Sequence, residues 1–131
     1  MKRIFEIHEL IEKLTPVFVK HDVVFAYLFG STVTNQNTAR DIDIAVYCRT
    51  IPKESFDKKL SIHLDMCRAL SADTIDIVVL NNTNNLILID EIIRNGIVIF
   101  DADTSFREQY ECSMIHKAID FKTQRLLTIG I

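Results

Sequence analysis

The amino-acid sequence predicts an α+β fold of the mixed α/β kind, with a small mixed β-sheet of about four strands packed with helices. Helical and strand-like patterns follow one another in the order helix, strand, turn, strand, helix, strand, helix, strand, helix. The first two strands are separated by a polar segment too short for a full crossover helix. Because parallel neighbours in a sheet need such a crossover, this spacing disfavours an all-parallel, doubly wound sheet.

The first two helices are predicted by apolar residues that recur every three or four positions. Residues 4–20 form the first, and Pro16 within them predicts a kink or an end. The second begins at Pro52, ends near Ser71, and is expected to bury one apolar face: Phe56, Leu60, Leu64, Cys67 and Leu70.

Two more helices follow in the second half of the chain. Residues 86–95 are followed by Gly96, where a C-terminal cap is expected. Ser105-x-x-Glu108 resembles a capping box and predicts the start of the last helix. Its stripe is expected to contact the core or a partner: Phe106, Tyr110, Met114, Lys117 and Phe121.

Four short segments rich in β-branched and aromatic residues are expected to be the strands. They lie at residues 23–29, about 41–48, 74–80 and 97–100. The run of Asn residues at 81–85 is interpreted as a loop.

Length and composition place the chain among ordinary globular proteins. Its 131 residues are expected to form one domain, residues 1–131, and the 48% apolar content is enough for one core. The net charge of −3 argues against broad nucleic-acid binding, which needs a basic surface.

The chain carries no signal for a membrane or an oxidising compartment. Its three cysteines are widely spaced, so neither a disulfide framework nor a zinc site is suggested. The longest apolar run, residues 23–29, is far too short to span a bilayer. The first residues are charged and lack the apolar block of a signal peptide, so we expect a cytoplasmic protein.

Two acidic residues are the sharpest functional signal in the sequence. Asp41 and Asp43 alternate with apolar residues at the start of the second predicted strand. Successive side chains of a strand point to opposite faces, so the two carboxylates share one face, roughly 7 Å apart. Their mutual repulsion is unfavourable unless a cation or a proton lies between them.

A third carboxylate and a Gly-Ser turn extend this signal. Asp76 is predicted inside a strand between two isoleucines, where a lone buried carboxylate would be unfavourable. If that strand lies beside the second one, three carboxylates converge, and such oxygen ligands suit Mg²⁺. Gly30 and Ser31 end the first strand and offer a close backbone approach, a hydroxyl and an amide to a phosphate. Together these features indicate nucleotidyl transfer from a nucleoside triphosphate, with Asp76 helping to deprotonate the acceptor hydroxyl.

These residues resemble the DNA polymerase β-type nucleotidyltransferase superfamily. The shared pattern is Gly30-Ser31, a gap of nine residues, Asp41-x-Asp43, and a later strand that carries Asp76. The short length is similar to that of the minimal nucleotidyltransferase (MNT) branch. The resemblance covers most of the chain, including the element at residues 95–100.

The resemblance also implies a function and a partner. Many members of the MNT branch are antitoxins paired with HEPN-domain ribonuclease toxins, and the family implies transfer of AMP from ATP to a tyrosine of the toxin. Carried over by position, Gly30 and Ser31 would hold phosphate. Asp41, Asp43 and Asp76 would be the catalytic residues and the ligands of two Mg²⁺ ions.

This sequence departs from the family pattern in the loop before the first aspartate. The family usually has ten residues there, often with a second glycine, whereas this chain has nine residues and no glycine in the gap. Arg40 precedes Asp41 and is a candidate contact of the nucleotide phosphates. A loop shorter by one residue is easily tolerated.

Two other functions remain open at this point. One is a catalytically silent antitoxin that blocks its toxin by binding, although such a scaffold gains nothing from clustered carboxylates. The other is a nucleotidyltransferase that modifies a small molecule. Members of that kind usually carry an added helical domain, for which this chain leaves too few residues. The sequence does not fix the nucleotide, the residues that contact its base, the acceptor residue or the oligomeric state.

Overall fold

The computed structural model describes residues 6–30, 41–51, 55–72 and 74–128. The elements appear along the chain in this order: α1 (Ile7–Lys20), β1 (Val23–Phe29), β2 (Ile42–Cys48), α3 (Ser55–Leu70), β3 (Ile75–Val79), the 3₁₀ turn η1 (Leu80–Asn82), α4 (Leu86–Asn95), β4 (Ile97–Asp101) and α5 (Thr104–Thr128). The prediction for β1 matches both ends of the strand, and those for β2, β3 and β4 agree to within one residue at each end.

The strands form a four-stranded mixed sheet, as predicted, in the order β3-β2-β1-β4. β1 lies in the middle of the sheet and pairs antiparallel with β2 on one side and with β4 on the other. β2 and β3 pair in parallel, with α3 as their crossover helix. Within the described residues, β3 is therefore an edge strand that has a strand neighbour on one side only.

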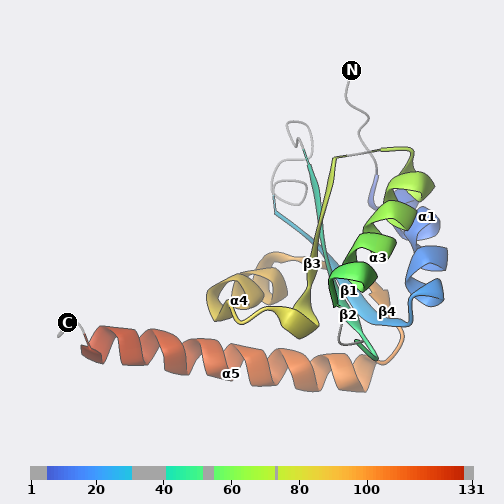
Figure 1. Cartoon of the computed structure of the whole chain (residues 1–131). Coiled ribbons are helices and arrows are strands. Elements are labelled where there is room, and N and C mark those ends of the chain that lie inside the picture. The colour runs from blue at the N-terminus through green and yellow to red at the C-terminus, as the bar shows by residue number, and fades with distance from the viewer. Residues whose placement is uncertain (1–5, 31–40, 52–54, 73, 129–131) are drawn as a thin grey trace.

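Helices cover both faces of the sheet, so the molecule has three layers (Figure 1). On one face, Leu14 of α1 and Met66 of α3 pack on Ile44 and Ile77 of the sheet in the larger core. On the other face, Ile92 of α4 joins the smaller core, against which Tyr110 and Met114 of α5 pack. The helices thus bury apolar side chains against both faces of one sheet.

α1 does not end at Pro16, although an end or a kink was predicted there. The helix continues to Lys20, and Leu14, Val17 and Phe18 are buried on its inner side. Proline lacks the N–H that would bond to the preceding turn. Packing of the last turn compensates, and the Thr15 hydroxyl donates a hydrogen bond to the Ile11 carbonyl (2.5 Å) within the same turn. The predicted start at residue 4 lies outside the described residues, and the described helix begins at Ile7.

The predicted buried face of α3 is wrong in part. Phe56, Leu60 and Leu64 are 73%, 43% and 44% exposed, whereas the fully buried residues are Ile62, Met66 and Leu70. Of the five predicted residues, Leu70 is buried and Cys67 is half-buried. The helix carries two adjacent apolar stripes, and periodicity alone does not say which one faces the sheet. The predicted start at Pro52 lies outside the described residues.

The beginning of α5 also differs from the prediction. The helix starts at Thr104, and the Asp103 carboxylate accepts a hydrogen bond from the Phe106 amide (3.1 Å). Asp103 therefore caps the helix in place of Ser105, since its carboxylate reaches a free amide of the first turn. The second half of α5 extends beyond the rest of the molecule (Figure 1). Within the described part of the chain, every helix is too short or too polar to cross a membrane.

Candidate active site

Asp43 and Asp76 are paired neighbours on two parallel strands. The register places Asp43 of β2 beside Asp76 of β3, with the Ile42–Ile75 and Ile44–Ile77 pairs on either side. Those isoleucines are buried in the larger core, so both carboxylates project from the opposite face of the sheet. Asp41 immediately precedes β2 and alternates with Ile42. The predicted partition of carboxylates and apolar residues between the two faces is confirmed.

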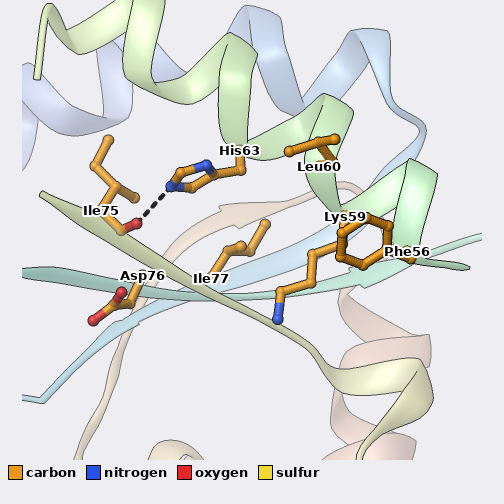
Figure 2. Close-up of a pocket in the computed structure, with 7 residues that line it drawn as sticks. All are labelled: Phe56, Lys59, Leu60, His63, Ile75, Asp76 and Ile77. Carbon is orange, nitrogen blue, oxygen red and sulfur yellow. Dashed lines mark hydrogen bonds between the residues drawn. The ribbon is translucent and has the colours of Figure 1, made fainter. Parts of the chain in front are cut away.

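The three carboxylates differ in exposure. Asp41 and Asp76 are exposed, whereas Asp43 is half-buried. Asp76 lies inside a strand, as predicted, and its exposure avoids the unfavourable burial of a lone carboxylate. Asp76 lies on the edge strand, which lacks a neighbour on its outer side, and its side chain points away from Leu60 and Phe56 (Figure 2). Sequence neighbours alone do not reveal that a strand with apolar flanks lies at a sheet edge.

Gly30 lies against the Asp43 carboxyl group at the end of β1. Its φ of +78° is a conformation that residues with a side chain rarely adopt. A Cβ atom at this position would collide with the Asp43 carboxylate oxygen and would lie 3.1 Å from its Cγ. A glycine is therefore required where the chain turns away from β1 directly above Asp43. Ser31 and Arg40, the other predicted phosphate contacts, lie outside the described residues.

Partial burial and repulsion between acidic groups together determine the electrostatics at Asp43. The pKa of Asp43 is raised to about 6, first by partial burial and then by the charges of Asp76 and Asp41. A raised pKa means that the ionised form is disfavoured in the protein alone. A divalent cation near Asp43 and Asp76 would relieve this repulsion.

The donor set fits a hard cation that completes its shell with other ligands. Across the described residues, no group of three or more His, Cys, Asp or Glu side chains is arranged to hold a metal ion by itself. Mg²⁺ commonly uses one or two protein carboxylates and takes its remaining ligands from water and substrate phosphates. The in-register pair of Asp43 and Asp76 is compatible with that coordination.

A cavity of about 420 Å³ lies beside Asp76 and was not foreseen from the sequence. It is bounded by α3 and β3, with Phe56, Leu60 and Ile77 among its lining residues (Figure 2). His63 also lines this cavity and donates a hydrogen bond to the Ile75 carbonyl (2.8 Å). The exposed stripe of α3 is the feature that could have indicated this cavity.

The Gly turn beside in-register carboxylates on a mixed sheet agrees with the nucleotidyltransferase pattern that the sequence resembles. The model of the "Polymerase beta, Nucleotidyltransferase" family matches residues 12–105, which is more than half of the chain. The chain belongs to this polymerase β nucleotidyltransferase family. No curated protein sequence matches it.

Solved structures of toxin–antitoxin complexes have the same fold. A chain of the tri-AMPylated Shewanella oneidensis HEPN toxin in complex with MNT antitoxin is 19% identical, with a TM-score of 0.73 and coverage of 95% of this chain and 97% of that chain. A chain of a toxin–antitoxin crystal structure with AMP-PNP is 20% identical, with a TM-score of 0.75 and coverage of 92% and 95%. A chain of a mutant MntA–HpeT toxin–antitoxin complex is 18% identical, with a TM-score of 0.75 and the same coverage. At these low identities, the TM-scores show that the folds are alike.

Proposed function

We propose that this nucleotidyltransferase is an antitoxin that transfers AMP from ATP to a hydroxyl, in particular a tyrosine hydroxyl, of a HEPN-domain toxin. The observation that carries the proposal is the in-register pair of Asp43 and Asp76 beneath Gly30. The similar structures support the acceptor, because one contains an AMPylated HEPN toxin with an MNT antitoxin and another contains AMP-PNP. We further propose that residues 1–131 form one domain and that it acts in the cytoplasm, which fits three cysteines that form no disulfide with one another.

The residues divide into those that hold the nucleotide and those that hold the metal. Asp41, Asp43 and Asp76 would hold Mg²⁺, and Gly30, together with Ser31 and Arg40, would hold the phosphates. Two bound Mg²⁺ ions would neutralise the triphosphate and stabilise the attacking and leaving oxygens. Gly30, which has no side chain, would offer its backbone to a phosphate beside the Asp43 carboxyl group.

Asp76 has the position of a proton acceptor. It is the exposed member of the in-register pair, so an acceptor hydroxyl can reach it from solvent. The hydroxyl oxygen would form a bond to the α-phosphorus while the bond to the oxygen bridging the β-phosphorus breaks, which releases pyrophosphate. The hydroxyl proton would pass to Asp76, a step that typically contributes a factor of about 10² to 10⁴ in rate.

The test is transfer of label from α-phosphate-labelled ATP, with Mg²⁺, to the co-expressed product of the neighbouring gene, which the proposal expects to be a HEPN-domain protein. The wild-type chain should label that protein, and the Asp41→Asn/Asp43→Asn double variant should not. Loss of label with neutralisation of toxicity intact would show that transfer is separate from neutralisation. Absence of label with the wild-type chain, while it still neutralises the toxin, would overturn the proposed transfer and favour a silent antitoxin.

A further inference from the structure

The outer edge of β3 carries backbone groups that face away from β2 next to Asp76. The Ile42 amide donates a hydrogen bond to the Thr74 carbonyl (2.9 Å), so Thr74 faces β2. Alternation along a strand then turns the backbone groups of Ile75 and Ile77 away from β2, toward the open edge. The hydrogen bond from His63 to the Ile75 carbonyl agrees with this direction. The N–H and C=O groups of Ile77 therefore point toward the side of β3 on which, among the described residues, no strand pairs with it.

An apolar groove runs along this edge. The cavity beside Asp76 shares Phe56, Lys59 and Ile77 with a second cavity of about 560 Å³, which continues to Asn84 and Leu88. Phe56 is 73% exposed and Leu60 is 43% exposed, which is unusual for large apolar side chains that lie beside one another on one helix face. We call this surface the β3 groove. It is continuous with the candidate active site because Asp76 lines it.

The side chains on the two sides of β3 indicate the shape of the occupant. Leu60 and Phe56 lie on one side of the strand, and Asp76 projects from the other (Figure 2). An extended segment added to the edge would lie about 4.8 Å from β3 and would place successive side chains on alternate sides. One residue would then lie opposite Asp76, while the residues before and after it would contact Phe56 and Leu60. Lys59 can donate hydrogen bonds to carbonyl or acidic groups of such a segment.

We propose that the β3 groove binds an extended segment of the acceptor protein, which pairs with the Ile77 backbone and places the acceptor hydroxyl opposite Asp76. The segment would have an apolar residue on each side of the hydroxyl-bearing one. This inference rests on the proposed function, since it names the docking site of the same acceptor. It explains why Phe56 and Leu60 are exposed beside the site.

The experiment compares two variants of the full chain and uses as the probe the HEPN-domain protein of the test above. Phe56→Ala/Leu60→Ala removes the exposed apolar wall of the groove, and Leu64→Ala is the matched control. Leu64 is 44% exposed on the same helix and lines a different cavity. The double variant should raise both the Kd and the KM for the HEPN protein at least tenfold. The Kd for Mg·ATP should stay within twofold, and Leu64→Ala should change none of these values.

A second readout is specific for an added strand. Binding of the HEPN protein should slow hydrogen exchange of the Ile77 amide at least tenfold, because that amide gains a hydrogen bond. An unchanged Kd for the HEPN protein in the double variant, or unchanged exchange at Ile77, would overturn the inference while label transfer by the wild type preserves the proposed function. Weaker Mg·ATP binding in the double variant would also overturn it, because the groove would then hold the nucleotide.

The two proposals can fail separately. If the wild-type chain transfers no label, the proposed function fails, but the Kd of the double variant and the Ile77 exchange still decide the docking site. If the wild-type chain does not bind the HEPN protein at all, the docking site is overturned as well.

Discussion

Asp43 experiences more electrostatic repulsion than an ordinary strand residue. Its carboxyl group has Asp76 beside it in register and Asp41 two residues earlier, and Gly30 lies directly against it. The sequence predicts the shared face of Asp41 and Asp43, because side-chain alternation in a strand is a local property. The sequence predicts that Asp76 lies beside Asp43 only if β2 and β3 are neighbours, because the register depends on which strands pair.

The raised pKa of Asp43 predicts how its removal changes stability with pH. The pKa is about 6 in the folded protein, above the value of about 4 for an unfolded chain, so ionisation of Asp43 destabilises the metal-free fold. Asp43→Asn should therefore increase the free energy of unfolding at pH 7.5. An increase of about 1 kcal/mol is expected, because solvent screens part of the effect.

The gain should appear between pH 4 and 6 and be absent below about pH 4, where the carboxyl group is protonated in both states. Denaturant unfolding with EDTA at pH 3.5, 5 and 7.5 measures it. A variant that is less stable than the wild type at pH 7.5 would contradict this electrostatic description of the site.

The end of α1 is joined to α3 by an ion network around Asp65. The Asp65 carboxylate accepts hydrogen bonds from Lys20 (2.9 Å) and from the buried His21 (2.7 Å), and Arg68 lies 3.5 Å away. The hydrogen bonds from Lys20 and His21 lower the pKa of Asp65 to about 2. No local pattern in α3 predicts this network, because Lys20 and His21 lie about 45 residues earlier in the chain.

Asp65→Asn should lower the melting temperature at pH 7, since the amide keeps the shape of the side chain and loses the charge. A carboxyl group with a lowered pKa contributes stability that is complete above about pH 4 and disappears as the pH falls toward 2. The difference between variant and wild type should therefore shrink over that interval. Thermal melts followed by circular dichroism measure it, with the exposed Asp120→Asn as control. A difference that is equal at pH 7 and pH 2.5 would show that the network acts without its charge.

Elements with one clear pattern were predicted well. β1 is a continuous apolar run between polar segments, and both of its ends agree with the structure. α3 was predicted with the wrong buried face because Ile62 and Met66 form a second apolar stripe beside Phe56 and Leu60. Asn81 was interpreted as part of a loop, yet its amide group hydrogen-bonds both the N–H (2.9 Å) and C=O (2.8 Å) of Cys48. That pairing depends on tertiary contact, which no local pattern reveals.

The arrangement of the whole sheet explains why the candidate site lies where it does. The short connection from β1 to β2 forces an antiparallel pair, and the crossover through α3 makes β3 parallel to β2. This combination places Gly30, Asp43 and Asp76 on three neighbouring strands or their ends, with the outer side of β3 open. The sequence predicted the mixed sheet from connection lengths. It could not predict the open edge, because the position of a strand within a sheet depends on long-range pairing.

The rate of AMP transfer by Asp76→Asn, at saturating Mg·ATP and HEPN protein, tests the central claim most directly. Asp76 is exposed at the edge of the sheet, so the asparagine should leave the melting temperature within a few degrees of the wild-type value. The account predicts that the rate of label transfer from α-labelled ATP falls by about 10² or more, with the HEPN protein still bound. A rate within twofold of the wild-type rate would contradict it, because the in-register pair of Asp43 and Asp76 would then not be the centre of the reaction.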